Sequence, residues 1–296
     1  MPNPPLDREE YIEQAYFFRV YRERLDQNMP AQEILESALE EILSTTKLPY
    51  ALEFLKGEML LHGHIAEGMA RLSHYFTPFQ AFVMSRAEED RSQFDHRMAL
   101  LVLEREAEYR AQPAPPQGLF IYQFECISRN KLGFDRGFSA MAEDPAYTPE
   151  WAEWILRSRL LLGTIEFADL IYLRSDQAVI DEQRKRHDPD FQPEQKPLFG
   201  AKEGRIAKAN RGKDPLYMFA ALQRQLGYPA VPRPVRAADD YLSPAALEAR
   251  MKLLEKRLQI IDTEMKGELD LRQFYAKGDS TGSPVAEDEL DFPSRE

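Results

Sequence analysis

The segment between Lys196 and Lys213 combines residue types that can bind an anion. It holds six basic side chains against one acidic side chain, Glu203. Glycines at three positions let backbone N–H groups turn toward a ligand, and a helix is expected to begin directly afterwards. A basic, glycine-rich loop over 196–213 would suit a phosphate, an RNA backbone or a carboxylate cluster. The candidate anion ligands are Lys202, Arg205, Lys208, Arg211 and Lys213.

The same segment is also typical of a solvated basic loop that acidic parts of the chain neutralise. Its spacing matches no known phosphate-binding loop, and Asn210-Arg211-Gly212 is a turn sequence that needs no ligand. We therefore favour the solvated loop and keep the anion-binding module as an alternative.

Two carboxylates, Glu166 and Asp169, lie in an apolar stretch. If that stretch is buried, both need partners, and Arg157, Arg159 and Arg174 are the nearest candidates in the sequence. We favour a buried ion-pair network. The alternative is an acid/base pair of an enzyme.

Other catalytic patterns are absent from the sequence. Four of the five histidines precede residue 112, but neither Glu-x-x-His nor His-x-x-x-His occurs, so we expect no metal and no cofactor. Cys126 lies in an apolar run, where a thiol is usually buried and inert. There is no nucleophile elbow, Walker-A loop or dinucleotide fingerprint. These features favour a protein that is not an enzyme.

The elements around these residues are predicted to be helices. A capping residue followed by proline predicts four helix starts. They are Thr77-Pro78, Thr148-Pro149, Asp214-Pro215 and Ser243-Pro244. Apolar residues at steps of three and four predict an N-terminal four-helix arrangement within 1–112. Its predicted helices cover 7–27, 30–46, 49–73 and 77–111.

Prolines between 113 and 116 suggest a domain boundary, followed by a second, mainly helical unit over 117–227. Residues 119–127 and 165–173 are rich in β-branched and aromatic side chains, so each fits a buried helix or a short strand. Two strands alone would make a poor sheet, and we favour helices.

The sequence of the C-terminal part predicts an amphipathic helix that binds to another protein surface. Residues 228–242 form a proline-rich connector, 243–270 an amphipathic helix, and 271–296 a disordered acidic tail. The apolar steps of four and three along that helix match a heptad seam. The seam consists of Leu247, Met251, Leu254, Leu258, Ile261 and Met265. Burying one leucine contributes about 1.5–3 kcal/mol, so Leu254→Asp should disrupt docking.

Composition also bears on the partners, the location and the class of function of this protein. The 296 residues carry a net charge of −12, which disfavours nucleic acid as a partner without excluding it. Apolar runs are too short to span a membrane, and the N-terminus lacks a signal-peptide pattern, so we expect a cytoplasmic protein. The fold expectation is mainly α. The leading hypothesis is a helical interaction or scaffold protein whose C-terminal helix docks on its own body or on a second copy.

Overall fold

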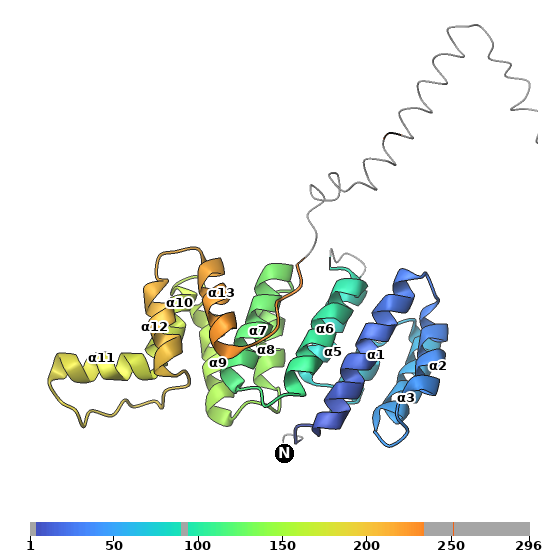
Figure 1. Cartoon of the computed structure of the whole chain (residues 1–296), viewed down its shortest axis with the longest axis horizontal. Coiled ribbons are helices and arrows are strands. Elements are labelled where there is room, and N and C mark those ends of the chain that lie inside the picture. The colour runs from blue at the N-terminus through green and yellow to red at the C-terminus, as the bar shows by residue number, and fades with distance from the viewer. Residues whose placement is uncertain (1–3, 90–93, 234–250, 252–296) are drawn as a thin grey trace, which may run out of the picture. The chain divides into compact units, whose positions relative to one another are not determined.

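A computed structural model describes residues 4–89, 94–233 and 251. In these ranges the chain forms thirteen helices and two isolated bridges, Leu162 with Ile165 and Ser175 with Phe199. The mainly α expectation is confirmed (Figure 1). The helices are α1 (Arg8–Asp26), α2 (Ala31–Glu41), α3 (Leu48–His62), α4 (Ala66–Arg71), α5 (Pro78–Glu88), α6 (His96–Arg110), α7 (Pro116–Asn130), α8 (Phe134–Ala142), α9 (Pro149–Leu161), α10 (Phe167–Leu173), α11 (Asp176–Arg186), α12 (Ala201–Ala209) and α13 (Pro215–Leu226).

The two ambiguous stretches of the sequence are both helical. Residues 119–127 belong to α7 and residues 165–173 overlap α10, so the strand alternative is wrong. Leu119, Phe120 and Ile127 on α7 are buried. A helix surrounded by other helices is apolar on every side, which explains why periodicity alone did not distinguish it from a strand.

The N-terminal part contains six helices, where the sequence predicted four. The predicted helix over 49–73 divides into α3 and α4 because Gly63 adopts φ +75° and ends α3, its N–H donating to the carbonyl of Met59. The predicted helix over 77–111 divides into α5 and α6, since Glu89 is already extended. The start of α5 at Thr77 is a full capping box with Gln80.

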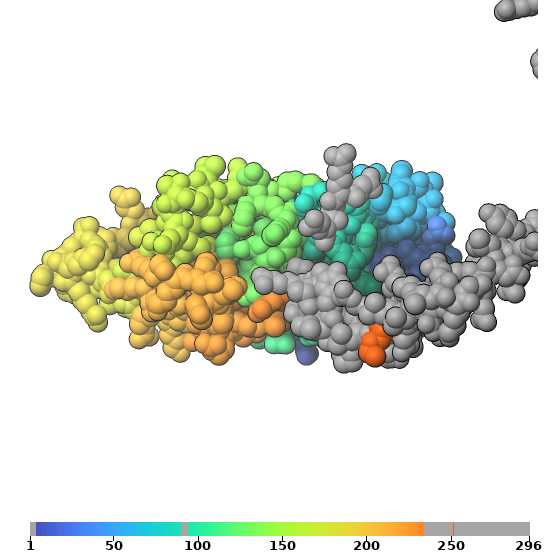
Figure 2. Space-filling view, turned by 90° about the horizontal axis from the view of Figure 1, so that it is seen from above, coloured from blue at the N-terminus to red at the C-terminus, as the bar shows by residue number. Residues whose placement is uncertain are grey.

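Residues Met1–Pro234 form one compact unit. The prolines between 113 and 116 connect α6 to α7 within it, so the boundary predicted there does not separate two compact units. Helices that follow each other in sequence mostly pack together: α2 on α3, α4 on α5, α8 on α9, and α12 on α13. In Figure 2 the colours run from blue through green to yellow along this unit, and the orange residues lie beside the green and yellow ones.

Two longer-range packings join the row. α1 packs along α6, and α7 packs against α13. The centre of the core is aromatic: the Phe120 ring lies 4.8 Å from that of Trp154 and 6.1 Å from that of Phe199. These contacts bring the segment that follows α11 against α7 and α9.

The C-terminal predictions fall largely outside the described residues. Leu247, Leu254, Leu258 and Ile261, the helix limits at 243 and 270, and the tail 271–296 are not described. Met251 is described, is helical and is 60% exposed. Among the described helices, none has the length and apolar character needed to cross a bilayer.

Candidate functional site

The predicted basic loop is largely a helix. Lys202, Arg205 and Lys208 lie on α12, so the expectation of a glycine-rich loop is wrong over 201–209. Gly204 sits inside this helix, where a Cβ would lie 2.1 Å from the Ser175 Oγ. This glycine therefore serves close packing of α12 against the start of α11. Gly212 does adopt a positive φ, of +66°, in the turn before α13.

Two of the predicted anion ligands are already paired with carboxylates. Lys208 Nζ contacts Asp181 Oδ2 at 2.5 Å, and Arg211 forms an ion pair with Asp169. The Arg211 guanidinium lies 4.2 Å from the centre of the Tyr172 ring, and the Tyr172 hydroxyl donates to Asp181 at 2.8 Å. Carboxylates of α10 and α11 thus neutralise two of the six basic residues of this segment.

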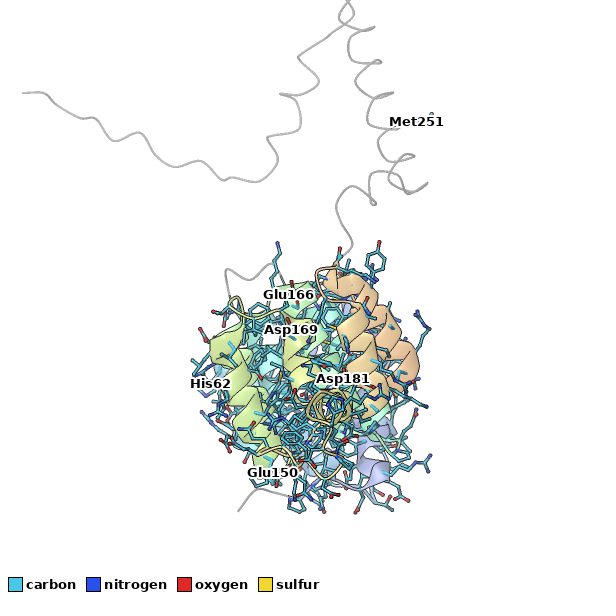
Figure 3. The ribbon with its side chains drawn as sticks, turned by 90° about the vertical axis from the view of Figure 1, so that its left-hand side faces the viewer. His62, Glu150, Glu166, Asp169, Asp181 and Met251 are labelled. Carbon is cyan, nitrogen blue, oxygen red and sulfur yellow. The ribbon has the colours of Figure 1, made fainter. Side chains whose placement is uncertain are left out.

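The carboxylate pair and the basic segment are therefore one cluster. Glu166 is exposed and accepts a hydrogen bond from the Gly212 N–H at 2.9 Å, and the Asp169 side chain is 32% exposed. The expectation of a buried network is wrong, because Glu166, the residue before α10, is exposed and Asp169, in its first turn, is only half-buried. Figure 3 shows Glu166 beside Asp169, whereas His62 and Glu150 lie apart from them.

The arginines predicted to serve these carboxylates point elsewhere. Arg159 contacts Ser139, while Arg174 donates to Gln195 and to the carbonyl of Lys196. Arg157 lines a small polar hollow together with Glu150. Residue spacing in the sequence did not predict these partners because the loop before α12 folds back over α9.

The electrostatics of the cluster oppose proton transfer near neutral pH. Hydrogen bonds from Lys208 and then Tyr172 lower the pKa of Asp181 to about 2. Burial, and then the bond to Asp181, raise the pKa of Tyr172. A general acid or base works best when its pKa lies near the operating pH, and both shifts move away from it.

The five predicted anion ligands do not converge on one concave surface. A hollow of about 340 Å³ beside the cluster is lined by Glu166, Gly212 and Lys213, among others. The other four predicted ligands do not line it. Lys202 and Arg205 are exposed on α12, and Arg205 Nε donates to the carbonyl of Ala201.

A buried polar network was missed from the sequence. Arg110 donates to Glu106 Oε1 at 3.0 Å and to Asp144 Oδ1 at 3.2 Å, and Gln123 also donates to Glu106, at 2.8 Å. Burial raises the pKa of Glu106. The Glu106–Arg110 spacing of four residues was the available signal, whereas nothing in the sequence links Arg110 to Asp144.

The exposed side of α3 is a second feature missed from the sequence. Tyr50, Leu60 and Leu61 are 76%, 58% and 77% exposed, and Phe54 is 38% exposed. A Cβ at Gly57, on the same side, would meet no atom within 4 Å. The opposite side packs into the core through Leu48, Leu52 and Leu55. The available signal was a helix with apolar residues at helical spacing on two opposite sides.

Metal and thiol chemistry find no support in the described part of the chain. No group of three or more His, Cys, Asp or Glu side chains there could hold a metal ion. Cys126 is buried, and burial raises the pKa of its thiol well above the usual value. Comparisons with protein-family models, with curated proteins and with solved structures found no match.

Proposed function

We propose that this chain is a non-catalytic helical interaction protein whose α3 face binds an amphipathic helix. The α3 face consists of Tyr50, Phe54, Gly57, Leu60 and Leu61. The observation that supports the proposal is the spacing of its exposed residues. The exposed Tyr50, Phe54 and Leu61, with the half-buried Gly57 between the last two, follow one another at steps of four, three and four, which is the pattern of a helix-pairing seam. Contiguous exposed apolar side chains mark interaction surfaces.

The chemistry-bearing residues give the other functions less support. Asp169 and Asp181 are held by Arg211 and Lys208, so two of the five predicted anion ligands are already paired. An enzyme centred on Glu166 and Asp169 would need a titrating group in a closed site, and both side chains are at the surface. Neither the anion-binding module nor the enzyme is therefore the preferred function.

A candidate ligand helix is present in the sequence itself. Residues 243–270 carry an apolar seam with the same alternation of four and three. Two helices that both repeat with this period can keep their apolar sides together along their length. The α3 seam runs over residues 50–61, and its first and last residues lie about 16 Å apart along the helix, which is enough for three such steps.

Peptide binding tests the proposal directly. A fluorescent peptide of residues 243–270 is titrated with the full chain carrying Leu254→Asp and Leu258→Asp, which disable the chain's own seam. We expect saturable binding by fluorescence anisotropy. Adding Leu61→Glu should abolish it, because a charge at a 77% exposed position spoils the seam without disturbing the core.

The matched control is Ala220→Glu, which adds the same charge at an exposed position of α13. This variant should bind the peptide as the parent chain does. Absence of peptide binding, or binding that Leu61→Glu leaves unchanged, would refute the proposed role of the α3 face.

A further inference from the structure

We propose that two copies of this chain pair through their α3 faces, with the two α3 helices antiparallel about a twofold axis. This inference rests on the proposed function, because it names the α3 helix of a second copy as a helix that the face binds. A peptide of residues 243–270 then competes with the second copy for the same surface.

α3 lies at one end of the row of helices, where a second row can continue the packing. Figure 1 shows α2 and α3 at this end and α11 at the other. The last helix of a stacked row usually turns a polar side to water. α11 follows this rule, since Gln177 is its only buried residue and it contains no large exposed hydrophobic side chain. α3 does not, because Tyr50, Leu60 and Leu61 are each more than half exposed.

This difference between the two ends favours a closed dimer over a filament. A head-to-tail contact would place the α3 face on the polar α11 end of the next molecule, and its repetition would build an open chain. A contact between two α3 faces uses the apolar end of both molecules and ends the assembly at two copies. A second copy is therefore a partner that covers this face in both molecules with one contact.

The shape of the face determines how the two helices run. Phe54 places a ring in the middle of the face, whereas Gly57 leaves open space, because a Cβ there would meet no atom within 4 Å. An antiparallel twofold axis midway between these positions places Phe54 of each copy over Gly57 of the other. The same register sets Tyr50 opposite Leu61 of the other copy. Parallel pairing would instead oppose two rings and leave two gaps facing each other.

The charges beside the face agree with this arrangement. The five residues of the α3 face carry no charge. The exposed Glu53 comes level with Lys56 of the second copy, about 3 Å apart along the helix axes. Lys56 also holds Glu36 of its own chain at 2.7 Å, so charges of both signs border the contact. Antiparallel helices also place the positive end of each macrodipole beside the negative end of the other.

Sedimentation velocity of the full chain tests the pairing. The face is small, so we expect a dissociation constant of about 1–100 μM, with the mass rising from one chain to two across that range. Leu61→Glu should raise this constant at least about 100-fold, because its charge enters the contact twice. Ala220→Glu, at an exposed position of α13, should leave the dimer unchanged. The combination of Leu254→Asp and Leu258→Asp should do the same, since neither residue belongs to the α3 face.

The outcomes separate this inference from the proposed function. A chain that stays monomeric throughout this range, or a dimer that Leu61→Glu leaves intact, would overturn the inference. If that chain still bound the 243–270 peptide through the α3 face, the proposed function would stand. If it bound neither the peptide nor a second copy, both would be refuted.

Exchanging the ring and the gap tests the register. Phe54→Ala and Gly57→Phe should each weaken the dimer at least about tenfold, the first by leaving two gaps and the second by opposing two pairs of rings. Their combination in one chain exchanges ring and gap, and should return the dissociation constant to within about threefold of the wild-type value. Circular dichroism checks that each variant is folded. A folded double variant that pairs as weakly as the single variants would overturn the inference.

Disulfide formation tests the direction of the helices. Facing Cα atoms of helices packed about 8–10 Å apart come within about 6 Å, which a disulfide can bridge. Chains with Tyr50→Cys and with Leu61→Cys, mixed and oxidised, should form a covalent dimer, while the buried Cys126 stays unreactive. Either variant alone should form little, because like positions lie about 16 Å apart along antiparallel helices. A covalent dimer from one variant alone, or none from the mixture, would overturn the antiparallel pairing.

Discussion

Removing the guanidinium of Arg110 should lower the stability of this protein more than a substitution at an exposed position does. The Arg110 side chain is only 4% exposed, and those of Glu106 and Asp144 are fully buried. Arg110→Ala leaves two carboxyl groups in the core with no cation between them. Breaking a buried ion pair by removing one partner destabilises proteins by about 3–5 kcal/mol.

That loss is large for a domain of this size. Folded domains are stable by about 5–15 kcal/mol, and each kcal/mol shifts the Tm by about 2–4 °C in a unit of 150–250 residues. Arg110→Ala should therefore lower the Tm by about 6–20 °C. Thermal unfolding, followed by circular dichroism and by the fluorescence of the buried Trp151 and Trp154, measures the change in Tm.

Glu106→Gln is the matched comparison. Burial raises the pKa of Glu106, and its Oε2 is buried without a hydrogen-bond partner. An amide keeps the acceptor for Arg110 and Gln123, so we expect a change within about 1 kcal/mol. If Glu106→Gln costs as much stability as Arg110→Ala, or if Arg110→Ala costs less than about 1 kcal/mol, the charge argument is wrong.

The pH dependence of stability follows from the same carboxyl group. The raised pKa means that the folded state binds the Glu106 proton more tightly than the unfolded state does. Protonated Glu106 therefore contributes fully to the free energy of unfolding below the unfolded pKa of about 4.3. The contribution is lost as the pH rises through the folded pKa. Glu106→Gln should remove this part of the decrease in the free energy of unfolding with rising pH.

Further predictions concern α12 and α3. Gly204→Ala should destabilise the fold by about 1–3 kcal/mol in thermal unfolding, since its Cβ would collide with Ser175. Gly57→Ala, in open space on α3, should stabilise by about 0.5–1 kcal/mol, and a loss there would contradict the packing described. Lys208→Met should raise the pKa of Asp181 from about 2, as followed by NMR titration, because the largest cause of its low value is removed. The stability that Asp181 contributes is present above its unfolded pKa of about 3.9 and is lost as the pH falls toward 2, and Lys208→Met should weaken that loss.

Local signals in the sequence predicted much of the helix pattern. Proline after a capping residue marked the starts of α5, α9 and α13, and Gly227, at φ +69°, ends α13 as its position suggested. Such signals act through neighbouring residues only. The break at Gly63 was visible as a residue type, but the apolar pattern on both sides of it favoured one continuous helix.

Signals from tertiary contacts were not available in the sequence. Gly204 looked like part of a ligand-binding loop because a glycine inside a helix is unfavourable unless another element needs the space. The contact with Ser175 supplies that reason. Likewise, Glu166 meets Gly212 across 46 positions and Arg110 meets Asp144 across 34, and no spacing rule connects residues so far apart.

Two adjacent helices show why the α3 face indicates a covering helix. α2 follows the usual pattern, with Ile34, Leu35 and Ala38 buried and with acidic side chains at the surface. α3 packs directly on α2, yet it exposes Tyr50 and Leu61. The two helices lie in the same region of the protein, so their location does not explain why the exposed side of α2 is polar and that of α3 is apolar. A covering helix specific to α3, as the proposed function requires, would explain it.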